Sequence, residues 1–218
     1  WTFETYAQAC CSYERLQAPG FFSGMRNIID KLYDDDPEQK AEACQRHMEF
    51  YNSEFALVGP VILGAAIAME EEKANGADID GQAISAIKTS LMGPLAGIGD
   101  TLRQGTLIPI IGSIAIALGQ AGNLFAPIFY MLATLALNWG ISHTLFMKVY
   151  DKGTAFVAEF FQGNRMEKIM TIITTMGSVT IGALAANTVK LSTPLELTLG
   201  EKVLNIQADI LDSVILNL

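Results

Sequence analysis

The longest stretch without a charged residue constrains this chain most: the run from Gln104 to Met147 contains no Asp, Glu, Lys or Arg. As one helix, rising about 1.5 Å per residue, it would be about 66 Å long, twice the roughly 30 Å hydrocarbon core of a bilayer. The run must therefore fold back, and the Gly-Gln-Ala-Gly-Asn sequence at 119–123 is the predicted turn. The sequence thus predicts two membrane spans, at about 102–118 and 126–148.

A third uncharged stretch, 169–189, is also long enough to cross a bilayer, which takes roughly 20 residues of helix. Residues 148–168, which precede it, contain four Lys and Arg residues, whereas the turn at 119–123 contains none. By the positive-inside rule, the basic loop is cytoplasmic and the turn is external. This orientation predicts a multi-pass protein of the bacterial cytoplasmic membrane whose N-terminal region is cytoplasmic.

Charge is divided unevenly along the 218-residue chain, whose net charge is −9. Residues 1–103 carry 8 basic and 16 acidic side chains, whereas the longer remainder carries 6 and 7. This asymmetry favours a chain that lies partly in lipid over a soluble domain. Half of the residues are hydrophobic, which excludes a disordered chain, and the negative net charge disfavours nucleic-acid binding.

Residues 1–54 are predicted to form amphipathic helices at the cytoplasmic face, before a membrane transport domain at 55–218. Aromatic and apolar side chains recur every three or four residues over 1–17, and a Pro-Gly pair then ends that helix. A second helix is predicted from Pro37 to about Tyr51, because Asp36 is a good N-cap and proline is favoured at the first helical position.

Two further apolar segments are predicted to be re-entrant half-helices. Residues 55–69 are uncharged, but a helix of that length spans only about 22 Å, and the acidic residues that follow are predicted to end it in water. The second segment, 83–100, ends in GPLAGIGD, where three glycines and a proline disfavour a continuous helix. Non-helical backbone at membrane depth is tolerated where it is buried in protein or lines a cavity.

The C-terminal part is predicted to contain a small external β-hairpin and the start of a further helix. Leucines alternate with other residues over 191–199, next to a proline and a glycine, which favours the hairpin. Apolar spacing over 201–218 favours a helix that continues into further membrane chain, and we expect Trp1 to lie within a longer gene product. The predicted fold class is an all-α polytopic membrane protein with re-entrant half-helices.

No catalytic motif, metal site or cofactor site is predicted. The sequence has no nucleophile elbow, Walker loop, HExxH or dinucleotide-binding fingerprint in a suitable context. Cys44 and His47 are three residues apart, but two further zinc ligands are missing. His143 lies in an apolar span, where a hydrogen-bonded core histidine is favoured over a proton relay, and His47 is expected on a helix surface or at an interface.

The candidate substrate-binding residues lie around the Gly-rich segment. A helix that starts near Asp100 would direct its free N–H groups, together with the backbone of Gly97 and Gly99, toward a cavity. The Asp100 carboxylate accepts hydrogen bonds and so suits a polyol, with Gln104 and Asn52 as weaker candidates. The alternative is that Asp100 only caps its helix, and the sequence leaves both interpretations open.

Several blocks together resemble a known family. GPLAGIGD at 93–100, AMEEEKANGADID at 68–80, GTLIPI at 105–110 and RHMEFYN at 46–52 are similar to the IID membrane subunit of bacterial mannose-family phosphotransferase systems. The resemblance covers essentially the whole chain. Thr101 to Gln104 lacks the aromatic residue that many mannose-type members carry before the matching glycine, which leaves the preferred sugar open.

This resemblance implies a subunit of a sugar-phosphotransferase complex without catalytic residues of its own. It would pair with a IIC membrane subunit to bind and translocate a hexose-type sugar. Soluble IIA and IIB proteins would carry the phosphate, and IIB would phosphorylate the sugar on entry. The family is expected to form trimers of IIC–IID pairs, to move substrate by an elevator-like motion, and in some members to act as a bacteriocin or phage-DNA receptor.

Two alternatives from other functional classes remain at this point. One is a membrane channel or scaffold subunit without sugar specificity, which sugar binding to a purified IIC–IID pair would exclude. The other is a soluble helical enzyme, which partition of the chain into detergent would exclude.

Overall fold

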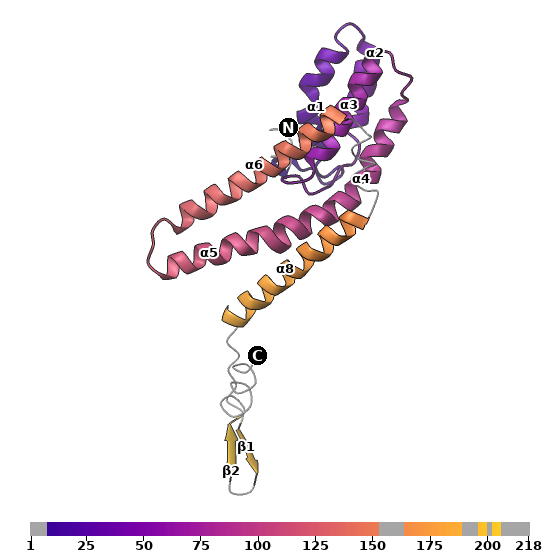
Figure 1. The fold of residues 1–218 in the computed structure, drawn as a ribbon. Helices are drawn as coiled ribbons and strands as arrows, with labels where there is room; N and C mark the ends of the chain where they lie inside the picture. Colours follow the sequence, from indigo (N-terminus) through magenta and orange to yellow (C-terminus); the bar gives the residue numbers. More distant parts are fainter. Residues whose placement is uncertain (1–7, 153–163, 189–195, 200–201, 206–218) are drawn as a thin grey trace. The chain divides into compact units, whose positions relative to one another are not determined.

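The computed structural model describes residues 8–152, 164–188, 196–199 and 202–205. Helices dominate these residues, and Figure 1 shows their order along the chain. The chain divides into two compact units, Trp1–Ile181 and Gly182–Leu218.

Three helices of the first unit, α1 (Ala18–Leu32), α2 (Pro37–His47) and α3 (Pro60–Ala74), pack together with α4 (Gly81–Leu102). We call this assembly the N-terminal helical body. Its buried core contains side chains from all four helices, including Phe21, Ala43, Ile62 and Ile84. The predicted start of α2 is confirmed, because the Asp36 side chain accepts a hydrogen bond from the Gln39 N–H.

The helix predicted over 1–17 is wrong in its described part. Residues 8–10 form a single 3₁₀ turn and 12–17 form turns and isolated β-bridges, whereas α1 begins at Ala18. Pro19 lies in the first turn of α1, where a proline needs no hydrogen-bond donor and has a suitable φ. The Pro-Gly pair therefore begins a helix in this chain instead of ending one. Residues 1–7 lie outside the described part.

Helix α3 begins five residues later than predicted and continues through the acidic run to Ala74. Every residue from Pro60 to Glu70 is buried, so this part of the helix is enclosed by protein on all sides. The acidic run does not end the helix in water, because Glu70 is itself buried among partners from α2 and from Tyr33, the residue that follows α1. Whether α3 enters the bilayer as a half-helix stays a prediction.

The break predicted within 93–100 is wrong, since α4 is continuous over Gly81–Leu102. It leads through a π-helical turn, η2 (Arg103–Leu107), into α5 (Ile108–Gln120). The buried positions of α4 recur at helical spacing and form one packed face: Ile84, Lys88, Leu91, Leu95 and Gly99. This packing outweighs the low helix propensity of the glycines and of Pro94, which lies on the exposed side.

Helices α5 and α6 (Ala126–Lys152) form an antiparallel hairpin, and α8 (Asn164–Thr188) follows (Figure 1). Helices lie where the sequence predicts three spans, but membrane crossing by each of them stays a prediction. The chain does turn where predicted, with Gly122 at a positive φ of 76°. In the described part of the chain, Gly81–Gln120 is the one helix that is long and apolar enough to cross a membrane by composition.

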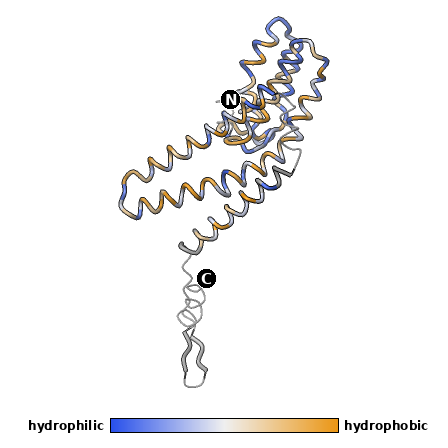
Figure 2. The backbone as a smooth tube through the Cα atoms, viewed as in Figure 1, coloured by the Kyte–Doolittle hydropathy of each residue, from blue (hydrophilic) through white to orange (hydrophobic). Residues whose placement is uncertain are grey.

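Large apolar side chains are exposed along α6 and α8, and Figure 2 shows apolar residues along both arms of the α5–α6 hairpin. Leu132, Trp139 and Val179, for example, are 51%, 43% and 66% exposed. Soluble monomers rarely expose so much contiguous apolar surface, so these faces favour contact with lipid or with another subunit.

In the second unit, β1 (Glu196–Leu199) pairs antiparallel with β2 (Lys202–Asn205), in the region where the sequence predicts a hairpin. The prediction of a helix from 201 is therefore wrong for its first turn. Val203 is β-branched and lies opposite Thr198, and such cross-strand pairs stabilise a hairpin. Residues 206–218 lie outside the described part.

Candidate functional site

Three of the five residues predicted to bind substrate line one polar pocket of about 240 Å³ in the first unit. Asp100 and Gln104 come from the α4–η2 junction, and Asn52 comes from the segment between α2 and α3. We call this cavity the Asp100 pocket. Its complete lining is Gln8, Gln17, Asn52, Ser53, Glu54, Phe55, Ala96, Asp100, Arg103 and Gln104.

Helical spacing explains one wall of the Asp100 pocket. Ala96, Asp100 and Arg103 follow one another at intervals of four and three positions, so they lie on one face of the helix. The opposite wall is held by hydrogen bonds, because the Gln17 amide oxygen accepts from the Ser53 N–H at 3.0 Å, and Ser53 Oγ donates to the Met92 carbonyl at 3.3 Å.

Asp100 does not begin a helix, so both the predicted helix start and the interpretation of Asp100 as its cap are wrong. The N-cap of α4 is Asp80, whose side chain accepts from the Gln82 N–H at 3.1 Å. Asp100 lies near the other end of the same helix, and its side chain is exposed at the pocket. The N–H groups around it are used within the helix and are not free for a ligand.

Gly97 and Gly99 do not line the pocket, and the two glycines differ. A Cβ atom added at Gly97 would meet nothing within 4 Å, whereas one at Gly99 would lie 2.5 Å from Glu54 Cβ and 2.6 Å from Val58 Cγ2. Gly99 therefore serves packing: it lets the segment before α3 approach α4 closely.

Glu54 is a residue that the sequence analysis missed. Its side chain is 1% exposed, and its carboxylate accepts hydrogen bonds from the backbone N–H groups of Ala56, Leu57 and Val58 at 2.8–3.0 Å. Burial of a carboxylate is tolerated because these donors satisfy it. The available sequence signal was its position, since Glu54 is the last charged residue before the uncharged run at 55–69.

Arg103 faces Glu54 across the pocket wall. Its Nε atom is 3.9 Å from Glu54 Oε1, which is an ion pair but too long for a hydrogen bond. The guanidinium carbon lies 5.9 Å from the centre of the Phe55 ring, and Nε is buried without a hydrogen-bond partner among the described residues.

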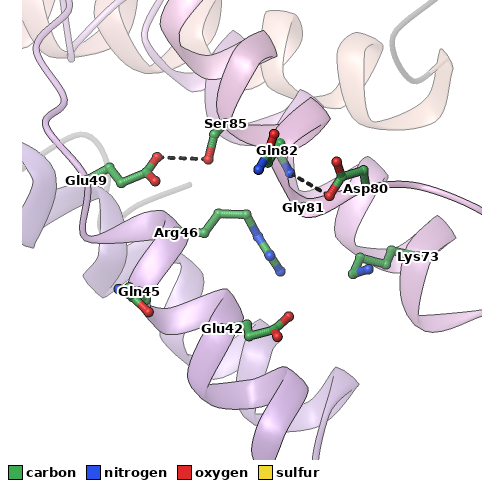
Figure 3. A pocket seen from close by; sticks show the side chains of 9 residues that line it. All are labelled: Glu42, Gln45, Arg46, Glu49, Lys73, Asp80, Gly81, Gln82 and Ser85. Atoms are coloured by element: carbon green, nitrogen blue, oxygen red, sulfur yellow. Dashed lines mark hydrogen bonds between the residues drawn. The ribbon is translucent and has the colours of Figure 1, made fainter.

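A second polar pocket, of about 620 Å³, lies between α2 and the start of α4 (Figure 3). Its charged residues are of both signs, with Arg46 and Lys73 near Glu42, Glu49 and Asp80. Ser85 Oγ donates to Glu49 at 2.8 Å, as the figure shows. Among the described residues, no three His, Cys, Asp or Glu side chains gather closely enough to hold a metal ion.

Beside this second pocket, Glu70 is the centre of a buried polar cluster. Its carboxylate accepts hydrogen bonds from Tyr33 Oη at 2.7 Å, from His47 Nε2 at 2.8 Å and from Arg46 Nε and Nη2 at 2.8 and 3.2 Å. Glu70 and His47 are both fully buried, so the prediction of a surface or interface position for His47 is wrong. Four donors compensate for taking the carboxylate out of water.

Burial and hydrogen bonding shift the pKa values in this cluster. Burial lowers the pKa of His47 to about 4, which outweighs the hydrogen bond to Glu70. For Glu70, burial alone would raise the pKa, but hydrogen bonds from His47, Arg46 and Tyr33 lower it to about 2. Burial and the hydrogen bond to Glu70 raise the pKa of Tyr33. At neutral pH the cluster therefore contains a neutral His47 and an ionised Glu70.

Acid is expected to destabilise the N-terminal helical body. The unfolded chain binds a proton at His47 as the pH falls through 6.5, whereas the folded chain does so only near 4, so stability is lost between these values. Glu70 adds a second loss as the pH falls from 4.5 toward 2. Thermal midpoints of the detergent-solubilised protein, measured from pH 7 to 4, test this. A His47→Gln variant has no titrating group at this position, so its thermal midpoint should no longer fall between pH 6.5 and 4. If the thermal midpoint of the natural chain does not change over this range, burial of a neutral His47 does not contribute to stability as proposed.

The fold and its surface define a class: a helical protein with exposed apolar helix faces and a polar pocket on a helix that is long and apolar enough to cross a membrane. The sequence model of the "PTS system mannose/fructose/sorbose family IID component" matches residues 1–218, and the chain belongs to this family of the bacterial phosphotransferase system. This confirms the resemblance seen in the sequence.

Individual relatives agree with this assignment. The chain is 33% identical over 188 residues to the mannose-specific EIID component of Escherichia coli K12, covering 86% of this chain and 66% of the relative. It is 33% identical over 195 residues to the sorbose-specific EIID component of Lacticaseibacillus casei, covering 89% and 68%. It is also 34% identical over 184 residues to the fructose permease IID component of Bacillus subtilis, covering 84% and 66%. The chain thus spans about two thirds of these relatives' length.

Two solved structures are also similar. One is the complex of the mannose transporter ManYZ with microcin E492, with a TM-score of 0.67 and 31% identity. The other is described as a membrane protein, with a TM-score of 0.77 and 30% identity. Each match covers 98% of this chain and 79% of the solved chain.

Proposed function

We propose that this chain is the IID subunit that pairs with a IIC subunit to bind and translocate a hexose-type sugar, which IIB phosphorylates on entry with phosphate carried by IIA. One observation supports the part of this proposal that assigns sugar binding to residues of this chain. Asn52 is far from Asp100 and Gln104 in the sequence, yet all three line one polar pocket in a protein of a sugar-transport family.

The chemistry of the Asp100 pocket suits a neutral polyol. Its carboxylate accepts hydrogen bonds from hydroxyl groups, and the side-chain amides of Gln8, Asn52 and Gln104 both donate and accept. Each hydrogen bond contributes only about 0.5–1.5 kcal/mol, so sugar recognition requires several aligned groups. A pocket lined mainly by amides and charged groups provides them.

Asp100→Asn is expected to lower sugar uptake at least tenfold while leaving assembly intact. The amide retains one oxygen but replaces a charged acceptor with a donor, so a hydrogen bond to a sugar hydroxyl is lost or weakened. Labelled-hexose uptake, divided by the amount of IIC–IID complex recovered from the same cells, measures the effect.

Asp78→Asn is the matched control for this test, because Asp78 is an exposed loop residue that does not line the pocket. It should leave uptake unchanged. Normal uptake by the Asp100→Asn variant would contradict the proposed role of the pocket in sugar binding.

The exposed apolar faces of α5, α6 and α8 support contact with the bilayer and with IIC. We further propose three spans within α4–α5, α6 and α8, and an assembly of three IIC–IID pairs that moves the sugar by an elevator-like motion. The similarity to the complex of the mannose transporter ManYZ with microcin E492 supports a further role as a bacteriocin receptor, with phage-DNA entry as a related use of the same surface.

The proposed topology places residues 1–54 and 70–82 in the cytoplasm and 190–202 outside. In a variant whose natural cysteines are replaced by serine, Ser192→Cys should react with an impermeant thiol reagent in intact cells. The natural Cys10 and Cys11, which are exposed, should react only after permeabilisation. Labelling of Cys10 and Cys11 in intact cells, with protection of the residue at 192, would reverse the topology.

A further inference from the structure

Asp100 and Arg103 carry opposite charges and line the same pocket, yet they do not pair with each other. Among the described residues, Arg103 forms an ion pair with Glu54 but not with Asp100. Neither side chain donates or accepts a hydrogen bond within the described part of the chain. Two charged groups that share a small cavity and keep their hydrogen-bonding capacity free are arranged for a ligand that contacts both.

Glu54 explains why Arg103 stays apart from Asp100. The carboxylate oxygens of Glu54 accept hydrogen bonds from the N–H groups of Ala56, Leu57 and Val58. The carboxylate is therefore fixed, and at 3.9 Å it attracts the guanidinium without forming a hydrogen bond to Nε. The Phe55 ring, 5.9 Å from the guanidinium carbon, adds a cation–π contact.

We propose that Arg103 is a specificity-determining residue that donates hydrogen bonds to a sugar oxygen, and that Glu54 is the positioning residue that holds it. The sugar hydroxyl groups bridge the two charges: one hydroxyl donates to Asp100, and a neighbouring oxygen accepts from the Arg103 guanidinium. This inference rests on the proposed sugar-binding function of the Asp100 pocket. It adds a positively charged donor to a site whose other polar side chains are amides, carboxylates and a serine.

The charge balance of the pocket defines the ligand class further. Glu54 and Asp100 carry negative charges and Arg103 carries a positive charge, so the lining has no excess of cations. An anionic sugar acid therefore gains no net attraction there, whereas a neutral polyhydroxylated ligand can use the acceptor and the donor at once. The Arg103 side chain is 20% exposed, so its guanidinium is a partly buried donor. A site with such a donor disfavours analogues that lack the matching oxygen, because the donor is then left unpaired.

The first test measures the sugar concentration for half-maximal uptake and the maximal uptake rate, for the full-length protein expressed with its IIC, IIA and IIB partners. Arg103→Met should raise the half-maximal concentration at least tenfold, Arg103→Lys should raise it less, and the maximal rate per recovered complex should change little. Arg26→Met, an exposed substitution on α1, is the control. The natural chain should also discriminate against one monodeoxy analogue of the hexose, and Arg103→Met should lose that discrimination.

The second test separates positioning by Glu54 from its structural role. Glu54→Gln keeps the size of the side chain and one oxygen acceptor but removes the charge that attracts Arg103. It should raise the half-maximal concentration in the natural chain and have little further effect in an Arg103→Met background. Equal effects in both backgrounds would show that Glu54 acts only through the backbone hydrogen bonds and would overturn its positioning role.

The outcomes also distinguish this inference from the function on which it rests. If Asp100→Asn impairs uptake while Arg103→Met leaves the half-maximal concentration and the analogue discrimination unchanged, the role of Arg103 is wrong and the pocket still binds sugar. If neither substitution changes uptake, the sugar-binding function of the pocket itself is wrong.

Discussion

Glu70→Leu is expected to destabilise the N-terminal helical body by about 3–5 kcal/mol, the cost of removing one partner from a buried ion pair. Leucine leaves the guanidinium of Arg46 buried without its carboxylate, and it also removes the acceptor for Tyr33 and His47. Because these partners come from α2 and the end of α1 while Glu70 lies on α3, the loss separates helices that the cluster joins. We expect the Glu70→Leu variant to show a large fall in the thermal midpoint and in the amount of IIC–IID complex recovered from cells.

Two further variants sharpen this test. Glu72→Gln changes an exposed carboxylate two residues away in the same helix and should be nearly neutral. The double variant Arg46→Met with Glu70→Leu removes both charges and should recover part of the lost stability, because an uncompensated buried charge no longer remains. A Glu70→Leu protein as stable as the Glu72→Gln protein would contradict the central role of Glu70.

The features that the sequence predicted correctly depend on local signals. The Asp36–Pro37 start of α2 needs only a capping side chain and a proline at the first position, and the turn at 119–123 needs only glycines between two uncharged runs. Such signals are contained within a few residues, so no knowledge of tertiary contacts is required to interpret them.

The features that the sequence did not predict depend on packing between distant segments. The GPLAGIGD segment contains helix-breaking residues, yet α4 continues because its buried face, which includes Leu95 and Gly99, packs against other parts of the first unit. The acidic run after Met69 resembles a solvent-exposed end, yet Glu70 is buried because Arg46 and His47 meet it from α2. A single sequence contains no direct signal for either contact.

The candidate site combines features that the sequence predicted with features that depend on packing between distant segments. Asp100, Gln104 and Asn52 were predicted by their chemistry, and they do line one pocket, although the helix start assumed for Asp100 does not exist. Glu54 and Arg103 are distant in the sequence, and only the fold brings them together as an ion pair. Residue chemistry was therefore a better guide to the pocket than the expected local backbone.

Gly99→Val is expected to cost about 3 kcal/mol or more and to reduce sugar uptake at least tenfold, because overpacking a tight contact forces the surrounding backbone to move. The new Cβ atom alone would lie 2.5 Å from Glu54 Cβ, and that neighbour sits close to its backbone and cannot swing away. Displacing Glu54 moves the carboxylate that faces Arg103, so the pocket wall changes together with the packing.

Gly97→Val is the matched control, two residues earlier in the same helix, where an added Cβ atom meets nothing within 4 Å. The two variants have the same composition and nearly the same helix propensity, so a difference between them reports the contact with Glu54. Thermal midpoints and uptake per recovered complex should both fall for Gly99→Val and change little for Gly97→Val. If the two variants behave alike, close packing of Gly99 against Glu54 does not hold the Asp100 pocket in shape.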